Sequence, residues 1–465
     1  MKIVFVNPPY VYSEQEKIPD APIERGKINT FPVGLGILAG LARAIGHDVS
    51  IVEMPYMTIK EAEDSIVNKA PDVVALSCWT GNQRSLALLC KSIKISLPRA
   101  KIVWGGHHAT LFAEQVLLHY DVDFVIQGEG EVPMTALLNE LDGGPPAVTP
   151  GIVRKLGEDI VCSGPRVRLE DLNGLPMPAY DLFQLAYNDG SEEKFGAKQF
   201  STSSKRVTLL ASRGCPFKCT FCVDGKLFSK TASREVFKVV DEIEFLVQEH
   251  NVRLFEFSDM TFTLSQKRTA ELCREIVRRG LDISWQAMSR VNTISDELLL
   301  LMRDAGCYSV SFGVETGSEV LLRRIQKQIT RAEIVSAFLK VAAAGLSTNM
   351  LLMVGNPGET EETIRETIDL LYEANPTQID PSIYQVYPGS ATYRQLVSTG
   401  YISDDYWLTH DAAPYYTGEH TYEKLKGWQD RLIFHHTYRP RHHLLWKIAA
   451  TIIGRFGSGQ TGVNS

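Results

Sequence analysis

The stretch Cys215-Pro-Phe-Lys-Cys219-Thr-Phe-Cys222 carries three cysteines at Cys-x3-Cys-x2-Cys spacing, directly after an apolar run that predicts a β-strand. Iron–sulfur clusters are normally closed by four thiolates, so three thiolates on one short loop predict a four-iron cluster with one iron open to another ligand. A structural zinc site needs a fourth ligand and usually a second Cys or His pair, which the neighbouring sequence does not supply. The other cysteines lack the spacing of a disulfide framework. They are Cys78, Cys90, Cys162, Cys273 and Cys307.

The cysteine loop resembles that of the radical S-adenosylmethionine (SAM) superfamily. The resemblance implies that Cys215, Cys219 and Cys222 are the metal ligands of a 4Fe-4S cluster whose open iron binds SAM. It also implies that an electron from the cluster splits SAM to a 5′-deoxyadenosyl radical. The electron would come from a donor protein such as flavodoxin or ferredoxin.

Length, composition and charge describe an ordinary globular protein with more than one domain. The chain has 465 residues, more than one core usually organises, with 44% hydrophobic and 22% charged residues. A formal net charge of −7 argues against nucleic acid as a partner. The apolar run Lys2–Val6, which Pro8 ends, is too short for a signal peptide, so a cytoplasmic location is expected.

The first 145 or so residues alternate strand-like and helical patterns, which predicts an open, mostly parallel α/β sheet. Ligands on such sheets bind outside the carboxyl ends of the strands. Strands are predicted at Lys2–Val6, Asp48–Val52, Val73–Ser77, Lys101–Trp104 and Phe124–Ile126. Helices are predicted at Val33–Ala44, Ile59–Lys69, Gln83–Ser96 and Glu131–Leu141.

The segments Phe31–Gly36, Gly105–Thr110 and Gly128–Glu131 resemble the N-terminal module of the cobalamin (B12)-binding radical SAM family. The resemblance implies a flavodoxin-like (Rossmann-type) B12-binding domain over residues 1–145. The motif Asp-x-His-x-x-Gly is absent, so cobalt is expected without a histidine lower ligand. For Gly105 and Gly106 a plain strand-to-helix turn is the alternative, and for His107 a polar loop residue. The cobalamin-binding residues that the resemblance implies are Pro8, Pro9, Gly34, Leu35, Trp79, Thr80, Gly105, Gly106, His107, Gly128 and Glu129.

A proline- and glycine-containing linker is predicted over residues 146–204, before a second βα series that predicts a partial (β/α)6 barrel over residues 205–395. Thr330 and Glu333 form a capping box, and Ser295, Gly306 and Gly345 mark further helix ends. Barrel strands are predicted at Val207–Ala211, Leu254–Phe257, Ile283–Gln286, Ser309–Gly313, Met350–Val354 and Ser382–Val386.

Loops after the barrel strands resemble the SAM-binding loops of the same family. Glu315, in Gly313-Val-Glu-Thr-Gly317, would reach the ribose, and Arg290 would pair with the SAM carboxylate. Asp259 lies where the family has Phe-x-Asp-Asp-x-Phe, but Met260 replaces the second acid. A core role for Phe221 and a salt bridge for Arg290 are the alternatives, and the sequence identifies no catalytic residue. The SAM-binding residues implied are Phe221, Asp259, Arg290, Gly313, Glu315, Gly355 and Tyr387.

The C-terminal segment 396–465 is predicted to be mainly α-helical, with a disordered tail from Gly457. Within it, residues 438–456 combine an apolar stripe with basic residues. This pattern suits a helix at the inner face of a membrane, and also a helix that caps the barrel core.

We therefore expect a cobalamin-dependent radical SAM enzyme that methylates an unactivated carbon of a small-molecule or lipid-like substrate. The family implies that methylcobalamin, recharged by one SAM, hands its methyl group to a substrate radical. Two alternatives stay open at this point. One is a cobalamin-dependent radical SAM oxidative cyclase or ring-rearranging enzyme, and the other is a non-catalytic iron–sulfur or corrin-carrying protein.

Overall fold

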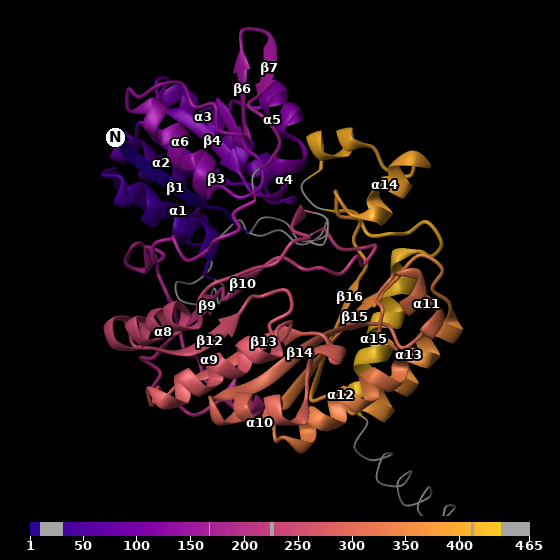
Figure 1. Ribbon diagram of the computed structural model, residues 1–465. Coiled ribbons are helices and arrows are strands. Elements are labelled where there is room, and N and C mark those ends of the chain that lie inside the picture. Colours follow the sequence, from indigo (N-terminus) through magenta and orange to yellow (C-terminus); the bar gives the residue numbers. More distant parts are fainter. Residues whose placement is uncertain (10–30, 167, 224–226, 411–412, 439–465) are drawn as a thin grey trace, which may run out of the picture.

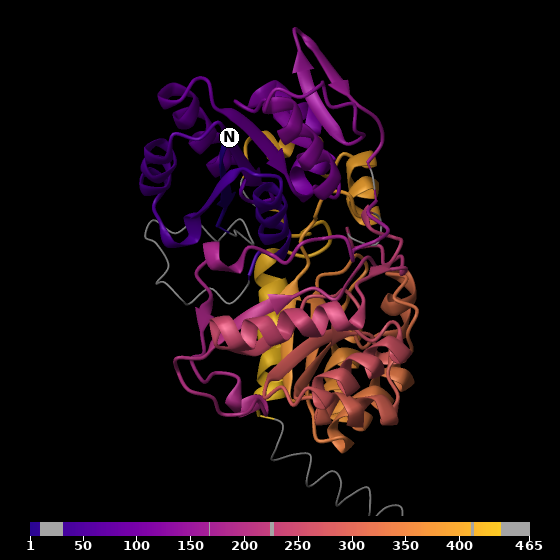
Figure 2. The ribbon, with the colours of Figure 1, turned by 60° about the vertical axis from the view of Figure 1, so that its left-hand side comes forward.

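The computed structural model describes residues 1–9, 31–166, 168–223, 227–410 and 413–438. Two α/β units are stacked on each other, with the N-terminal unit above the open sheet of the second unit in Figure 1. The C-terminal part of the chain runs along the right-hand side of both units in Figure 1, and its yellow helix is partly hidden behind the second unit in Figure 2. This arrangement confirms the predicted fold class.

The first sheet has the strand order β2-β1-β3-β4-β5-β6-β7. Its first five strands are parallel, in the flavodoxin-like order 2-1-3-4-5, whereas β6 and β7 are antiparallel additions. The strands are β1 Lys2–Asn7, β2 Asp48–Glu53, β3 Val73–Ser77, β4 Lys101–Gly105, β5 Phe124–Ile126, β6 Ile152–Leu156 and β7 Asp159–Cys162.

Helices cover both faces of the first sheet. Apolar residues of α1 and α6 pack on one face, and those of α2, α3 and α5 on the other. The N-terminus of α2 is closed by a capping box between Thr58 and Glu61. The helices are α1 Val33–Ala44, α2 Ile59–Lys69, α3 Gln83–Ser96, α4 His107–Leu111, α5 Ala113–His119 and α6 Glu131–Leu141.

The second sheet is an open half-barrel of six parallel strands, with the antiparallel β8 at its far edge, in the order β16-β15-β14-β13-β12-β9-β8. Its strands are β8 Ala186–Tyr187, β9 Lys205–Leu209, β12 Val252–Phe257, β13 Ser284–Ser289, β14 Cys307–Glu315, β15 Ser347–Val354 and β16 Gln378–Ile383. Its helices are α8 Val236–His250, α9 Gln266–Arg278, α10 Asp296–Asp304, α11 Glu319–Arg324, α12 Arg331–Ala343 and α13 Glu361–Ala374.

Two sequence-based predictions need correction. The last barrel strand is Gln378–Ile383 rather than Ser382–Val386, and Pro381 is accommodated because β16 is an edge strand. The segment 146–204 is not only a linker, because β6 and β7 extend the first sheet and β8 extends the second. The capping box at Thr330 is present as predicted.

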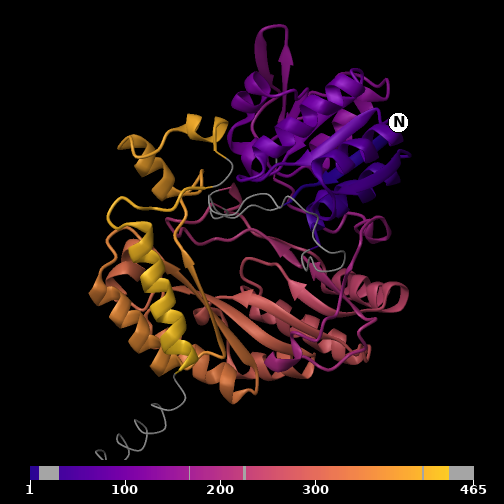
Figure 3. The ribbon, with the colours of Figure 1, turned by 180° about the vertical axis from the view of Figure 1, so that it is seen from behind.

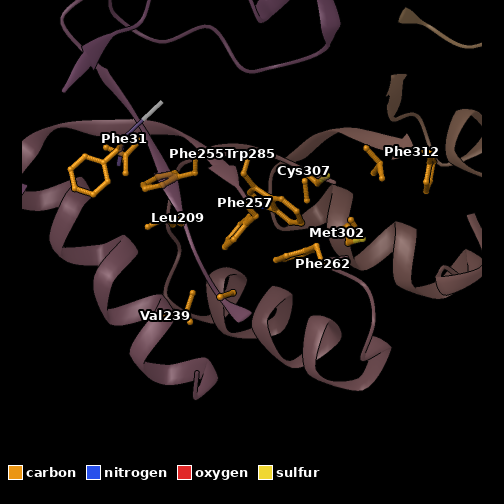
Figure 4. Close-up of a cluster of buried hydrophobic side chains, with 14 of the residues drawn as sticks. Phe31, Leu209, Val239, Phe255, Phe257, Phe262, Trp285, Met302, Cys307 and Phe312 are labelled. Atoms are coloured by element: carbon orange, nitrogen blue, oxygen red, sulfur yellow. The ribbon is translucent and has the colours of Figure 1, made fainter. Parts of the chain in front are cut away.

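One apolar core runs through both units. Phe31 from the first unit packs with Tyr180 of the connecting segment, and its backbone N–H donates to Thr208 Oγ1 at 3.3 Å. Figure 4 shows the part of this core beneath the barrel sheet, where Phe257, Phe262 and Trp285 lie together. The two units are therefore packed together through buried side chains.

The C-terminal helices attach to different parts of the molecule. Helix α15, Tyr422–Thr437, lies along the edge strand β16 (Figure 3) and buries Leu425, Trp428 and Leu432. Helix α14, Ala391–Ser398, stands above the barrel edge, close to the first unit. Residues 439–465, which include most of the predicted interfacial helix, lie outside the described part of the chain. No helix within the described residues is long and apolar enough to cross a membrane.

Candidate cofactor site

A cavity of about 480 Å³ lies between the two units. Its upper wall is made of residues at the carboxyl ends of the first sheet's strands, where flavodoxin-like sheets bind ligands. Its lower wall comes from the ends of β9 and β12 and from the segment around β10, Ser212–Arg213. The predicted cobalamin residues that line it are Pro8, Gly34, Leu35, Trp79, Gly105, Gly106, His107, Gly128 and Glu129.

Glycines leave room for a bulky ligand at two places in this wall. A Cβ atom on Gly34 would meet no atom within 4 Å, and one on Gly105 would meet only the Ile126 carbonyl oxygen at 3.9 Å. Gly106 has another role, because its φ of +93° and a Cβ position 2.6 Å from the Cys78 carbonyl oxygen both require glycine. The wall therefore fits a flat, bulky cofactor such as a corrin.

Two predicted cobalamin residues do not line the cavity. The Pro9 carbonyl oxygen accepts a hydrogen bond from Asn82 Nδ2, and Thr80 Oγ1 is 3.4 Å from His108 Nδ1. His108 is fully buried, and burial lowers its pKa to about 3. His107, by contrast, stacks on Trp79 with ring centroids 4.3 Å apart at the cavity wall.

Glu129 lines the cavity, but both of its carboxylate oxygens have protein partners. Oε1 accepts from Arg168 at 2.6 Å and from Arg213 at 3.3 Å, and Oε2 accepts from the Leu169 N–H at 2.6 Å. Arg213 also donates to Glu131 at 2.6 Å. Burial alone would lower the pKa of the Arg213 guanidinium, but the two glutamates raise it overall. Glu129 is thus better explained as part of an ion-pair network than as a direct cobalamin ligand.

The cysteine loop follows β9 and β10 and lies at the rim of the half-barrel. All three cysteines are half-buried. Backbone hydrogen bonds fix the loop, from Cys215 N to Phe228 O, from Thr220 N to Ile325 O and from Cys222 N to Cys219 O. Within the described residues no three His, Cys, Asp or Glu side chains are grouped as a single metal ion requires. A four-iron cluster does not require such a grouping, because each of the three thiolates binds a different iron.

Arg290 lies against the cysteine loop and is only 5% exposed. Its Nη1 is 3.9 Å from Cys219 Sγ, its guanidinium stacks 3.6 Å from the centroid of the Phe217 ring, and its Nη2 donates to the Lys327 carbonyl oxygen. Its Nε is buried without a hydrogen-bond partner. A positive charge beside the thiolates would stabilise the anionic cluster and any anionic group bound to it.

Sequence analysis missed Lys327, which joins several predicted SAM residues. Its Nζ donates to Glu315 Oε1 at 2.7 Å and lies 5.6 Å from the centroid of the Phe221 ring. A Cβ on Gly313 would come within 2.9 Å of both Lys327 Nζ and Glu315 Oε1, so glycine makes room for this ion pair. No motif marks Lys327 in the sequence, since it lies twelve positions after Glu315 in an irregular segment.

The backbone around this ion pair adopts left-handed conformations at residues that are not glycine. Glu315 has a φ of +72°, and Gln326 and Gln328, on either side of Lys327, have φ of +54°. Such conformations cost about 1–3 kcal/mol each and tend to cluster at functional sites. The strain is consistent with a binding role for Glu315 and Lys327.

Asp259 is placed differently from a SAM ligand. It is 1% exposed, and its carboxylate accepts hydrogen bonds from Ala211 N at 2.9 Å and from Ser212 Oγ. Burial raises its pKa, and these hydrogen bonds oppose the shift. Asp259 therefore holds the turn between β9 and the cysteine loop, whereas the side chain of Met260 lines the cavity.

Gly355 and Tyr387 lie at the far side of the barrel rim. Gly355, with a φ of +90°, packs against Leu425 of α15, and its N–H donates to Glu359. The Tyr387 hydroxyl donates to Gln385 Oε1 at 2.6 Å, and Tyr387 and Phe221 each pack against the same apolar cluster. Arg290 thus contacts the cysteine loop directly, and Gly313 and Glu315 lie beside Lys327, whose ammonium group is near Phe221 of that loop. Asp259 supports the turn before the loop, whereas Gly355 contacts α15.

Family comparisons agree with this geometry. A model of the B12 binding domain matches residues 26–138, and a model of the radical SAM superfamily matches residues 209–371. The protein is therefore a radical SAM enzyme with a B12-binding domain. The chain belongs to the cobalamin-binding radical SAM family.

The relatives of the chain include more than one kind of enzyme. An uncharacterised methyltransferase of Pyrococcus horikoshii is 29% identical over 381 residues, covering 81% of this chain and 80% of the relative. An anaerobic magnesium-protoporphyrin IX monomethyl ester cyclase of Rubrivivax gelatinosus is 28% identical over 409 residues, 85% of this chain and 70% of the cyclase. The solved structure of the radical SAM methyltransferase TsrM of Kitasatospora setae shares the fold, with a TM-score of 0.68 and 18% identity over 86% of this chain and 78% of TsrM.

Proposed function

We propose that the protein is a cobalamin-dependent radical SAM methyltransferase that acts on an unactivated carbon of a small molecule. The observation that supports the proposal is the cavity that both units line, because the strand ends that would hold the corrin and the segment that leads into the cysteine loop face the same space. When bound, the cluster and SAM supply a carbon radical, and cobalamin supplies a transferable methyl group. The protein's contribution is to hold these groups in one enclosed space.

Particular side chains would hold the cluster, SAM and cobalamin in this space. Cys215, Cys219 and Cys222 would bind the cluster, and Arg290 would balance its negative charge. Glu315 and Lys327 would hold the polar groups of SAM, with Phe221 beside them. Gly34 and Gly105 would leave room for the corrin.

An oxidative cyclase is the second candidate, because the Rubrivivax relative with that name is nearly as similar as the methyltransferase. Both reactions would use the same cofactors and differ in what leaves the substrate. Anaerobic reconstitution with hydroxocobalamin and SAM, followed by mass spectrometry of small molecules from the source cell, distinguishes them. Methyl transfer adds the mass of one methylene group, whereas cyclisation removes hydrogen. Absence of any SAM cleavage would instead support a corrin-carrying protein without catalysis.

The cysteine ligands can be tested separately. Replacing Cys215, Cys219 and Cys222 by Ala should abolish the cluster, because no other thiol lies on the loop. Iron and sulfide per chain would be measured after anaerobic reconstitution, with Cys162→Ala, an exposed cysteine of β7, as the control. An unchanged iron content in the triple variant would refute the assignment.

The remaining partners are part of the same proposal. A flavodoxin or ferredoxin would supply the electron, since the cluster must be reduced before SAM is cleaved. A lipid-like substrate, or contact with the inner face of the membrane through residues 438–456, rests on the sequence pattern alone.

A further inference from the structure

The cysteine loop is carried by a very short stem. Strands β10, Ser212–Arg213, and β11, Ala232–Ser233, pair antiparallel to each other and belong to neither of the two large sheets. An isolated pair of such short strands has little stability of its own. Something else must therefore hold the loop in a defined position.

Two arginines and two glutamates hold the stem on both sides. Arg213, on the first strand, donates to Glu131 at 2.6 Å and to Glu129 at 3.3 Å. Arg168 donates to Glu129 at 2.6 Å, to the Arg213 carbonyl oxygen at 3.2 Å and, just before the second strand, to the Lys230 carbonyl oxygen at 2.9 Å. The glutamates belong to the first unit, at and just before the start of α6. In Figure 1 the stem strand β10 lies between the two units.

These contacts are not ordinary surface ion pairs. The side chains of Glu129 and Glu131 are 7% exposed, that of Arg213 is 13% and that of Arg168 is 17%. Taking four charges out of water is costly, and apolar residues usually give equal or greater stability at such positions. The network is therefore better explained by the geometry that it imposes than by the stability that it adds. All four side chains also line the cavity.

We propose that Arg168, Arg213, Glu129 and Glu131 are positioning residues that fix the cysteine loop against the corrin-binding wall and thereby set the separation between cluster and cobalt. Cys215 follows Arg213 by two residues, and its N–H donates to the carbonyl oxygen of Phe228. The Phe228 ring in turn lies 5.6 Å from the Arg168 guanidinium. A shift of either arginine is thus transmitted directly to the first cluster ligand. The inference rests on the cofactors of the family and not on which reaction they perform.

The test compares Glu131→Gln with Glu140→Gln in the full chain reconstituted with iron, sulfide and hydroxocobalamin. Both glutamates lie on α6 and pair with an arginine, but Glu140 pairs with Arg154 inside the first unit, at 2.6 and 2.9 Å. Hydrogen exchange of peptides covering residues 212–233 reports the stem. The EPR relaxation of cob(II)alamin beside the reduced cluster reports the separation, because a nearby paramagnet speeds relaxation steeply as the distance falls. Neither measurement needs a substrate, so both are independent of the proposed methyl transfer.

In Glu131→Gln we expect iron and cobalamin contents to stay unchanged, exchange of residues 212–233 to rise about three- to tenfold, and the cob(II)alamin relaxation rate to change. In Glu140→Gln neither the exchange of residues 212–233 nor the cob(II)alamin relaxation rate should change. Stem exchange at the wild-type rate, equal acceleration in both variants, or faster exchange with unchanged relaxation would overturn the proposal. If Glu131→Gln does not fold, Arg213→Lys, which keeps the charge but loses the planar fork, is judged by the same criteria.

Discussion

At the scale of single residues, Lys327 lies among several of the predicted SAM-binding residues. Its ammonium group pairs with Glu315 and lies near the Phe221 ring, and its own backbone carbonyl oxygen accepts a hydrogen bond from Arg290 Nη2. The side chains of Lys327 and Glu315 are 7% and 13% exposed, so neither charge is well solvated. Removing the lysine would leave the Glu315 carboxylate buried without its cationic partner. The free-energy cost of such an unpaired charge is larger than the net stabilisation that the intact ion pair provides.

We expect Lys327→Met to raise the dissociation constant of SAM about tenfold or more, because hydrogen bonds to charged groups contribute about 1.5–3 kcal/mol. Calorimetric titration of SAM into the anaerobic, cluster-loaded protein measures this change. Lys94→Met is the control, since Lys94 pairs with Asp123 at 2.7 Å in the first unit. Equal SAM affinity in both variants would remove Lys327 from the site.

Glu359 should give the protein a distinct pH dependence. Its side chain is buried beside the loop after β15, and burial raises its pKa from 4.5 to about 7, although the Gly355 and Asn356 N–H groups oppose the shift. Between about pH 4.5 and pH 7 the folded protein keeps this proton while the unfolded chain releases it. The contribution of Glu359 to stability therefore falls as pH rises through that window, by up to about 3 kcal/mol.

Glu359→Gln should remove this loss, because the amide oxygen can still accept the two N–H groups and carries no charge. The variant's thermal unfolding midpoint, taken relative to wild type, should rise from pH 5 to pH 8. Glu362→Gln, an exposed position on α13, should show no such trend. A parallel pH profile for wild type and Glu359→Gln would show that the carboxyl is already ionised in the folded protein.

At the scale of elements, the C-terminal segment joins parts that are distant in the sequence. The Thr392 N–H, at the start of α14, donates to the Thr220 carbonyl oxygen in the cysteine loop. Gln83, at the start of α3, is fully buried and donates to the His410 carbonyl oxygen at 2.6 Å, just after the short helix Asp404–Leu408. The segment therefore connects the cysteine loop to the first unit.

Replacing Gln83 by Leu should release this segment, because the His410 carbonyl oxygen would lose its buried donor and the Gly81 N–H its acceptor, at a cost of about 1–3 kcal/mol each. Limited proteolysis should then cleave more rapidly between residues 399 and 417. Gln248→Leu, on the exposed face of α8, serves as the control. Unchanged cleavage in Gln83→Leu would mean that the other contacts of the segment, among them the hydrogen bond from Arg84 to the Thr409 carbonyl oxygen, are sufficient to hold it.

At the scale of the whole molecule, the chain can be truncated after α15 without removing any of the buried residues of that helix. Leu425, Trp428 and Leu432 supply its buried contacts, and all three precede Thr437. Truncation after Thr437 should leave the cluster content and SAM cleavage intact. If residues 438–456 contact membrane, co-sedimentation with anionic liposomes should fall, since basic residues would no longer attract the surface. An insoluble truncated protein would point instead to a capping helix.

Predictability differed between elements for physical reasons. The helices α1, α2, α3 and α6 begin and end at the residues that their helical patterns predicted. The last barrel strand was misplaced, because Pro381 argues against a strand unless the strand is known to lie at an edge. The strands β6 to β8 and the stem β10–β11 were missed, because each is short and forms only by pairing with a strand elsewhere.

The sequence by itself determined the class of protein, because three cysteines on one loop and alternating strand and helix patterns are local properties. It also pointed to nine residues that line the cavity, since the carboxyl ends of parallel strands meet at one edge. Only the tertiary structure decided which charges meet there. The pairs Lys327–Glu315 and Arg213–Glu131 join residues 12 and 82 positions apart, and Glu129 proved to bind arginines. The first pairing depends on how the segment after α11 folds back toward β14, and the second on how the two units pack, and no local pattern encodes either.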